Sequence, residues 1–194
     1  MYEMILSFFL AYLIGSVSFA YIAGKLKGKD LREEGSGNLG AKNVQRVLGN
    51  GFAIAVLTLD VLKGGAGVFV AMALSGEKLA AFIGWLGIVC GHGWPVFLKF
   101  KGGKGLASSA GALMVISPFL LVVELVAGMV ILIISRNLYM AAIIMTAFLP
   151  VMVYILKASP SLVVVSFVIS AVIIYLHKKN ILEIRSNLGR KFKT

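Results

Sequence analysis

The sequence predicts an all-α fold: a polytopic membrane bundle of about seven transmembrane helices, with the N-terminus outside and the C-terminus inside. Three observations predict it, namely the composition, the long apolar runs and the placement of the positive charges. Hydrophobic residues make up 59% of the 194 residues and charged residues 14%, and the mean hydropathy is +0.95. Soluble domains are about 45–50% apolar and about 25% charged. The composition therefore excludes a water-soluble enzyme and a disordered chain.

A helix needs about 20 mostly apolar residues to cross a membrane. The first such run, 4–23, contains no charged residue, and no Lys or Arg precedes it. Because a secretory signal begins with a positively charged segment, we expect this run to be a retained membrane helix. The other apolar runs are 51–74, 79–98, 106–135, 138–156 and 161–176. No repeat or linker separates them, so we expect a single transmembrane domain over residues 1–194.

The number of spans depends on the run 106–135, which Ser117-Pro118 divides. Cytoplasmic segments are enriched in Lys and Arg. With seven spans and an outside N-terminus, 16 of the 19 Lys and Arg lie inside, and only Lys78 and Lys157 lie outside. With six spans, the basic tail would lie outside. We therefore predict seven spans, and expect the short run 106–116 to start deeper in the preceding loop, to tilt or to be enclosed by protein.

The loop after the first span is rich in glycine and short polar residues. Glycine permits tight turns and leaves backbone N–H groups accessible, which favours an anion-binding nest. Arg46 adds a planar guanidinium that fits phosphate or carboxylate. The alternative is a flexible polar loop without a ligand. The candidate residues of this first segment are Gly35, Ser36, Gly37, Asn38, Gly40, Asn43 and Arg46.

The loop after the third span places two glycines, a lysine and a third glycine directly before a helix. Backbone N–H groups at a helix N-terminus bind anions, and a lysine strengthens the site. It is not a Walker A loop, since Leu98 and Gly105 stand where that motif needs Gly and Ser or Thr. The glycines would either allow a positive φ or let the backbone approach a phosphate. The alternative is a flexible inside loop. The candidate residues of this second segment are Lys101, Gly102, Gly103, Lys104 and Gly105.

A third polar cluster, with His177 and Asn180, follows the last span. A histidine at this boundary is equally compatible with a merely interfacial position. The remaining basic tail is suited to lipid headgroups.

Several ionisable residues fall inside the spans. Asp60 and Lys63 are i,i+3 neighbours on one helix face, and in lipid they must pair or meet polar partners. His92 lies near the inside end of its span beside Pro95, as either a proton carrier or a packing residue. Glu124 lies in the middle of its expected helix. Under the seven-span prediction the three polar segments share the inside face, which indicates a cytoplasmic site for phosphate-bearing molecules.

The three segments resemble the three motifs of bacterial acyl-phosphate:glycerol-3-phosphate acyltransferases of the PlsY type. The resemblance extends in order over the whole chain, and the first two motifs are specific. The sequence departs from the family pattern at Lys42, where Thr is usual, and at Glu183 and Gly189, where Arg and Glu would stand.

The resemblance implies transfer of a fatty acyl group from acyl phosphate to the 1-hydroxyl of glycerol 3-phosphate, the first step of phospholipid synthesis. It implies a monomer in the bacterial inner membrane whose site faces the cytoplasm, with lipid as neighbour, and with no cofactor, metal or nucleic acid. We expect catalytic roles for Ser36, Arg46, Lys104, His177 and Asn180. We expect substrate contacts from Gly35, Gly37, Asn38, Gly40, Asn43, Asp60, Lys63, His92, Lys101, Gly102, Gly103 and Gly105. The base stays open among His92, His177, Asp60 and a substrate phosphate oxygen.

Two other functions remain compatible with the residues. A transporter of a phosphorylated solute would use intramembrane charges such as Asp60 and Lys63, and inverted repeats would favour it. A non-catalytic lipid-binding scaffold needs the basic tail but not the ordered glycines.

Overall fold

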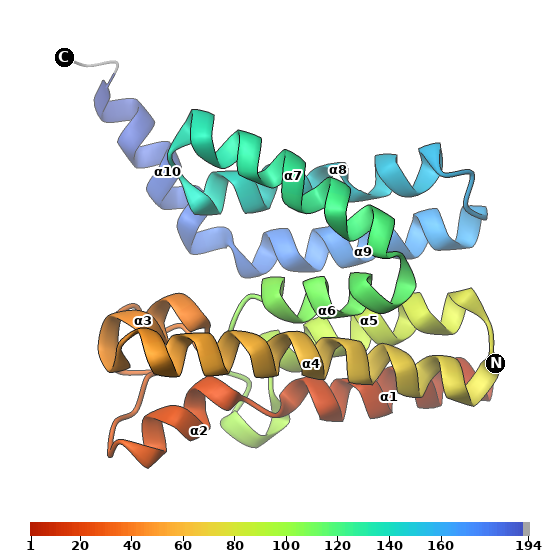
Figure 1. Cartoon of the computed structure of the whole chain (residues 1–194), viewed down its shortest axis with the longest axis horizontal. Helices are drawn as coiled ribbons and strands as arrows, with labels where there is room; N and C mark the ends of the chain where they lie inside the picture. The colour runs from red at the N-terminus through yellow and green to blue at the C-terminus, as the bar shows by residue number, and fades with distance from the viewer. Residues whose placement is uncertain (192–194) are drawn as a thin grey trace. The chain divides into compact units, whose positions relative to one another are not determined.

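The computed structural model describes residues 1–191, with side chains described up to Ser186. The described chain consists of helices and connecting loops (Figure 1). It divides into two compact units, Met1–Pro118 and Phe119–Thr194, each of which is described by itself. The helices are α1 (Tyr2–Ser16), α2 (Phe19–Leu26), α3 (Ala41–Leu48), α4 (Asn50–Ser75), α5 (Lys78–Gly93), the 3₁₀ turn η1 (Val96–Leu98), α6 (Leu106–Ile116), α7 (Pro118–Ser135), α8 (Leu138–Ile155), α9 (Pro160–Leu176) and α10 (Lys178–Lys191).

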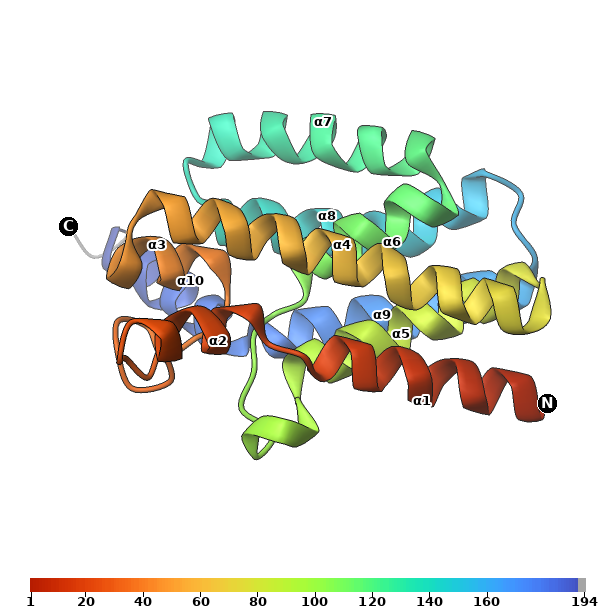
Figure 2. The same ribbon diagram turned by 60° about the horizontal axis from the view of Figure 1, so that its bottom comes forward.

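The first unit is a bundle in which α1, α4 and α5 pack side by side and α6 packs on α4 and α5 (Figures 1 and 2). Small residues allow helices to approach closely in membranes. A Cβ added to Gly64 of α4 would collide with the Ser108 carbonyl of α6, and one added to Gly111 of α6 would collide with the Val61 carbonyl of α4. The short α6 therefore packs closely against α4, with Met114 and Val115 exposed, and how it lies in the membrane remains a prediction.

The expected first span is two helices rather than one. The chain leaves α1 after Ser16 and passes through Val17 and Ser18 in extended conformation before α2 begins. Ser18 caps α2, because its hydroxyl accepts the backbone N–H of Tyr21 at 3.2 Å. The break leaves carbonyl groups at the end of α1 without helical partners.

In Figure 2 the turn η1 projects from the helices of its unit, and the loop from η1 to α6, which carries the second polar segment, leads back to them. Lys99 and Phe100 both adopt positive φ there, and Gly105 enters α6 with φ of 78°. At the other end of α6 the chain breaks at Ser117, and α7 starts with Pro118, so the predicted division of the run 106–135 is confirmed.

In the second unit α8 and α9 pack against each other, and α10 contacts both. Asn137 caps α8 by accepting the backbone N–H groups of Tyr139 and Met140. Pro160 occupies the first turn of α9, where its missing N–H costs no hydrogen bond. The chain bends by 60° between α9 and the start of α10.

The all-helical membrane class is confirmed. Among the described residues, five segments are long and apolar enough to cross a membrane, and α9 with the start of α10 would be a sixth as a bent pair. The remaining apolar helix, α6, has 11 residues. The number of seven crossings and their orientation remain predictions, as does the expectation of a single domain.

We expect cysteine labelling in sealed vesicles to place Arg46, Lys104, Arg136 and Lys178 inside and the N-terminus outside. The reason is the strong excess of Lys and Arg on that side under the positive-inside rule. A variant without Cys90 serves as the background, and single cysteines at Lys78 and Lys157 serve as outside controls. Labelling of Lys104→Cys by an impermeant reagent from the outside would contradict this topology.

Candidate active site

The first polar segment is a loop held in shape by one buried side chain, that of Asn43 on α3. Its Oδ1 accepts the backbone N–H of Ser36 at 2.8 Å. Its Nδ2 donates to the carbonyl groups of Leu31 and Glu34 at 3.1 and 3.0 Å. The Asn43 side chain thus acts on the loop backbone, and Ser36 is left at the exposed surface of the loop.

Two glycines allow this loop to turn tightly. Gly35 and Gly37 adopt φ of 66° and 70°, the left-handed region that other residues rarely occupy. A Cβ on Gly35 would also collide with Oδ1 of Asn43. The expected role of glycine in turning this loop is confirmed at both positions.

Asp30 and Arg32 brace the start of the same loop. Asp30 accepts the backbone N–H of Arg32 at 3.0 Å and pairs with its guanidinium at 2.6 Å. The side-chain hydrogen bond from Arg32 is the main reason that the pKa of Asp30 lies well below its ordinary value. The guanidinium also lies over the ring of Tyr21, at 5.0 Å from the centroid.

Helix α3 separates structural from exposed polar residues. Asn43 and Val44 are buried, whereas Lys42 and Arg46, one turn apart, are exposed. Val44 belongs to an apolar core with Leu31, Leu39 and Leu98. This packing fixes α3 beneath the loop and leaves Arg46 accessible to an anion.

We expect Asn43→Asp to lower activity and to loosen the loop at Ser36. The carboxylate could still accept the Ser36 N–H but could not donate to Leu31 and Glu34, and a buried unsatisfied carbonyl costs about 1–3 kcal/mol. Hydrogen exchange should increase at 31–36, with Gln45→Ala, an exposed change on the same helix, as the control. Unchanged exchange and kinetics would contradict the role assigned to Asn43.

The second polar segment contacts the first one directly. The backbone N–H of Leu39 donates to the Gly102 carbonyl at 3.4 Å, and the N–H of Gly103 donates to the His92 carbonyl at 2.9 Å. A Cβ on Gly103 would collide with Nε2 of His92 and lie 2.7 Å from the Leu39 carbonyl. The structure therefore brings the first two segments together at Gly102 and Gly103, as the shared-face prediction requires.

Among the glycines of the second segment, Gly105 adopts a positive φ. Gly102 and Gly103 do not adopt positive φ, so that explanation is wrong for these two glycines. Both are instead required by close approach. A Cβ on Gly102 would collide with the His92 carbonyl and lie 2.6 Å from Cδ of Pro95.

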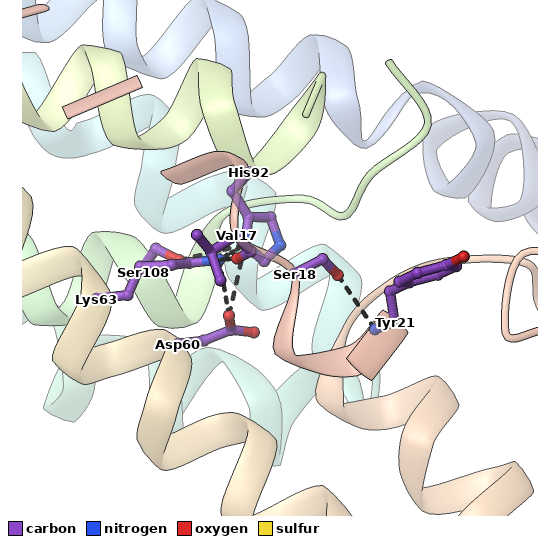
Figure 3. Close-up of polar contacts among 7 residues, drawn as sticks. All are labelled: Val17, Ser18, Tyr21, Asp60, Lys63, His92 and Ser108. Carbon is purple, nitrogen blue, oxygen red and sulfur yellow. Dashed lines mark hydrogen bonds and ion pairs between the residues drawn. The ribbon is translucent and has the colours of Figure 1, made fainter. Parts of the chain in front are cut away.

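A buried polar network lies behind this loop (Figure 3). Nζ of Lys63 forms an ion pair with Oδ1 of Asp60 at 2.9 Å, although Oδ1 receives no well-directed hydrogen bond. Nζ also donates to the Val17 carbonyl at 2.8 Å and lies 3.1 Å from Nδ1 of His92. The hydroxyl of Ser108 lies 3.3 Å from the same nitrogen. The predicted pairing of Asp60 and Lys63 is confirmed.

Sequence reasoning missed two members of this network. Ser108 lies in the first turn of α6, and Val17 contributes only its backbone carbonyl at the break after α1. Polar residues beside the glycine-rich segment were a signal for Ser108. Nothing in the uncharged run 4–23 indicated that the Val17 carbonyl would be available.

The third polar segment lies in the second unit. His177 is fully buried, its Nδ1 lies 2.8 Å from the Ile173 carbonyl, and its ring contacts that of Tyr139 at 6.4 Å. Nδ2 of Asn180 donates to Glu183 at 3.3 Å, so one departure from the family pattern contacts a predicted catalytic residue. That the third polar segment lies close to the first two segments remains a prediction. The expectations for the end of the chain, namely the departure at Gly189 and the basic tail, concern side chains outside the described ones. These are Gly189, Arg190, Lys191 and Lys193.

Known proteins resemble this chain in sequence and in fold. A family model described as glycerol-3-phosphate acyltransferase matches residues 5–187. A glycerol-3-phosphate acyltransferase of Thermoanaerobacter pseudethanolicus is 38% identical over 192 residues, covering 96% of each chain. Its counterpart in Aquifex aeolicus is 36% identical over 184 residues, covering 94% of this chain and 95% of that protein.

Two solved structures are also similar. The crystal structure of PlsY (YgiH), an integral membrane glycerol 3-phosphate acyltransferase, in its glycerol 3-phosphate form matches with a TM-score of 0.87 and 34% identity, covering 95% of this chain and 92% of that one. Its lysophosphatidic acid form matches with a TM-score of 0.84 and 33% identity over the same shares. The chain belongs to the PlsY family of integral membrane glycerol-3-phosphate acyltransferases.

Proposed function

We propose that this enzyme transfers a fatty acyl group from acyl phosphate to the 1-hydroxyl of glycerol 3-phosphate, giving lysophosphatidic acid and inorganic phosphate. Both substrates carry phosphate, so the site needs two anion-binding segments close together. The observation that carries the proposal is the contact between the two glycine-rich loops, made by Leu39 and Gly102. The glycerol 3-phosphate and lysophosphatidic acid forms of the similar structure support the acceptor and the product.

The transfer is a single displacement. The substrate hydroxyl oxygen attacks the acyl carbonyl carbon, the bond from that carbon to the phosphate oxygen breaks, and inorganic phosphate leaves. An acyl phosphate is already activated, so positioning and charge stabilisation suffice. Arg46 and Lys104 hold the phosphates, and Ser36 donates a hydrogen bond to a phosphate or acyl oxygen. The hydroxyl proton passes to a phosphate oxygen or to His177, because Lys63 engages both Asp60 and Nδ1 of His92.

The decisive experiment gives purified protein acyl phosphate and glycerol 3-phosphate and measures phosphate release. Release that requires both substrates and yields lysophosphatidic acid supports the proposal. Acylation with an acyl thioester and none with acyl phosphate would contradict the proposal that acyl phosphate is the donor. Flux of glycerol 3-phosphate into liposomes without acylation would favour a transporter instead.

We expect no covalent acyl-enzyme. Cys90 lies within α5 and has no activating partner indicated by the sequence, and Ser36 has no hydrogen bond to a histidine among the described contacts. Mass spectrometry of protein quenched after mixing with acyl phosphate alone should show unmodified chain, and Cys90→Ser should remain active. A stoichiometric adduct on Ser36 or Cys90 that glycerol 3-phosphate removes would contradict direct transfer.

We place the enzyme in the bacterial inner membrane as a monomer, with the site at the cytoplasmic face. The support is the inside position that the positive charges predict for both glycine-rich loops.

A further inference from the structure

The ammonium group of Lys63 is surrounded by three hydrogen-bond acceptors. A lysine ammonium has three N–H donors and no acceptor. Within 3.1 Å of Nζ lie three acceptors from three parts of the fold: Asp60 on α4, the Val17 carbonyl at the α1–α2 break and Nδ1 of His92 on α5. The Lys63 side chain is nearly fully buried, so bulk water does not take the place of these partners.

The identity of the proton on His92 follows from this arrangement. An ammonium can only donate to Nδ1, and a nitrogen that accepts carries no proton. The tautomer of a histidine is set by the partner of its other ring nitrogen. We propose that Lys63 fixes His92 as the neutral Nε2–H tautomer, which donates a hydrogen bond from Nε2 to a substrate phosphate oxygen held between the two glycine-rich loops. His92 is then a donor and not the general base.

The position of Nε2 supports this assignment. The ring is more than nine-tenths buried, and Nε2 points at Gly103, beside the Leu39 carbonyl, where the two loops meet. None of the hydrogen bonds among the described residues uses Nε2. Nε2 keeps some accessible surface although most of the ring is buried, so its N–H can reach an anionic oxygen that arrives with the substrate.

This inference rests on the proposed function only for the identity of the ligand. The tautomer itself is measured on the resting protein, without turnover. Nitrogen NMR of histidine-labelled protein in lipid nanodiscs should show a neutral His92 with the proton on Nε2, and the spectrum of His92→Gln identifies its signals apart from those of His177. A proton on Nδ1, or a doubly protonated ring, would overturn the proposal. In Lys63→Met the proton should move to Nδ1, because the ammonium is gone and the Asp60 carboxylate, 3.8 Å away, is an anionic acceptor for an Nδ1–H.

Binding is tested with the same signals. Inorganic phosphate or glycerol 3-phosphate at saturation should shift the Nε2 resonance of the wild-type protein. An unshifted resonance in protein that turns over glycerol 3-phosphate would overturn the role of His92. If the protein proves inactive with acyl phosphate but shows the Nε2–H tautomer and the phosphate shift, the proposed donor fails while this inference stands.

Two variants separate a donor from a base. A glutamine amide can occupy the position of Nε2, whereas an asparagine amide reaches only the position of Nδ1, and neither can take up a proton. His92→Gln should retain kcat/KM within roughly tenfold, and His92→Asn should lose roughly ten- to hundredfold, mainly through the KM of the phosphate substrate. Equal and complete loss of kcat in both variants, with both proteins folded, would favour a base and overturn the proposal.

Discussion

Arg46→Ala and Lys104→Ala are each expected to lower kcat/KM at least roughly ten- to hundredfold while the protein still inserts into the membrane. Arg46 is exposed on α3, whereas Asn43 and Val44 are buried, so its loss removes a ligand for phosphate and little packing. Lys104 precedes Gly105 at the N-terminus of α6, where backbone N–H groups and a positive charge act on the same anion. A hydrogen bond to a charged group is worth about 1.5–3 kcal/mol, and more where water is excluded.

The chain offers matched controls for both changes. Lys99→Ala removes an exposed lysine from the same loop, and Gln45→Ala removes an exposed residue from the same helix. Both should keep nearly full activity with unchanged substrate dependence. Lys104→Arg should also lose activity, because a bulky guanidinium replaces a compact ammonium between glycines. Wild-type kinetics in both alanine variants would contradict the phosphate site.

Hydropathy was sufficient to locate the long helices, because lipid requires every backbone group in a span to bond within its own helix. It also located the break before Pro118, since proline cannot continue the preceding helix. The break at Val17 and Ser18 could not be found this way. Both residues are compatible with a helix. At the break the Val17 carbonyl accepts a hydrogen bond from Lys63, which is 46 residues away in sequence.

The sequence likewise predicted the local features of the candidate site but not the contacts between its helices. Positions 60 and 63 share a helix face by spacing alone, and their pairing follows from the cost of an isolated charge in lipid. Their contact with His92 and Ser108 depends on the packing of α4, α5 and α6, which no local pattern encodes. In the same way, spacing marked Asn43 as a polar residue of the first loop but could not show that its amide holds the backbone at Ser36.

The glycines of the second loop illustrate how tertiary structure changes the reason for a correct expectation. The sequence indicated that Gly102 and Gly103 had to be glycine, through either positive φ or close approach to a ligand. The structure shows close approach to protein atoms: the His92 carbonyl for Gly102, and the His92 ring and Leu39 carbonyl for Gly103. The loop therefore packs directly on His92, and the position of Lys104 depends on this packing.

Gly103→Ala is expected to lose most activity, and Gly102→Ala to be clearly impaired, without loss of membrane insertion. At Gly103 the new Cβ would meet a ring that Lys63 and Ser108 hold on its far side, so the loop must move rather than the ring. Overpacking of this kind costs about 1–3 kcal/mol, and a displacement of the adjacent Lys104 adds a loss of phosphate binding. Kinetics and thermal unfolding should be compared with Gly51→Ala, where an added Cβ meets nothing within 4 Å. That control should match the wild type in both measurements, whereas full activity in the Gly102→Ala, Gly103→Ala double variant would show that the loop is flexible and that its glycines do not position the site.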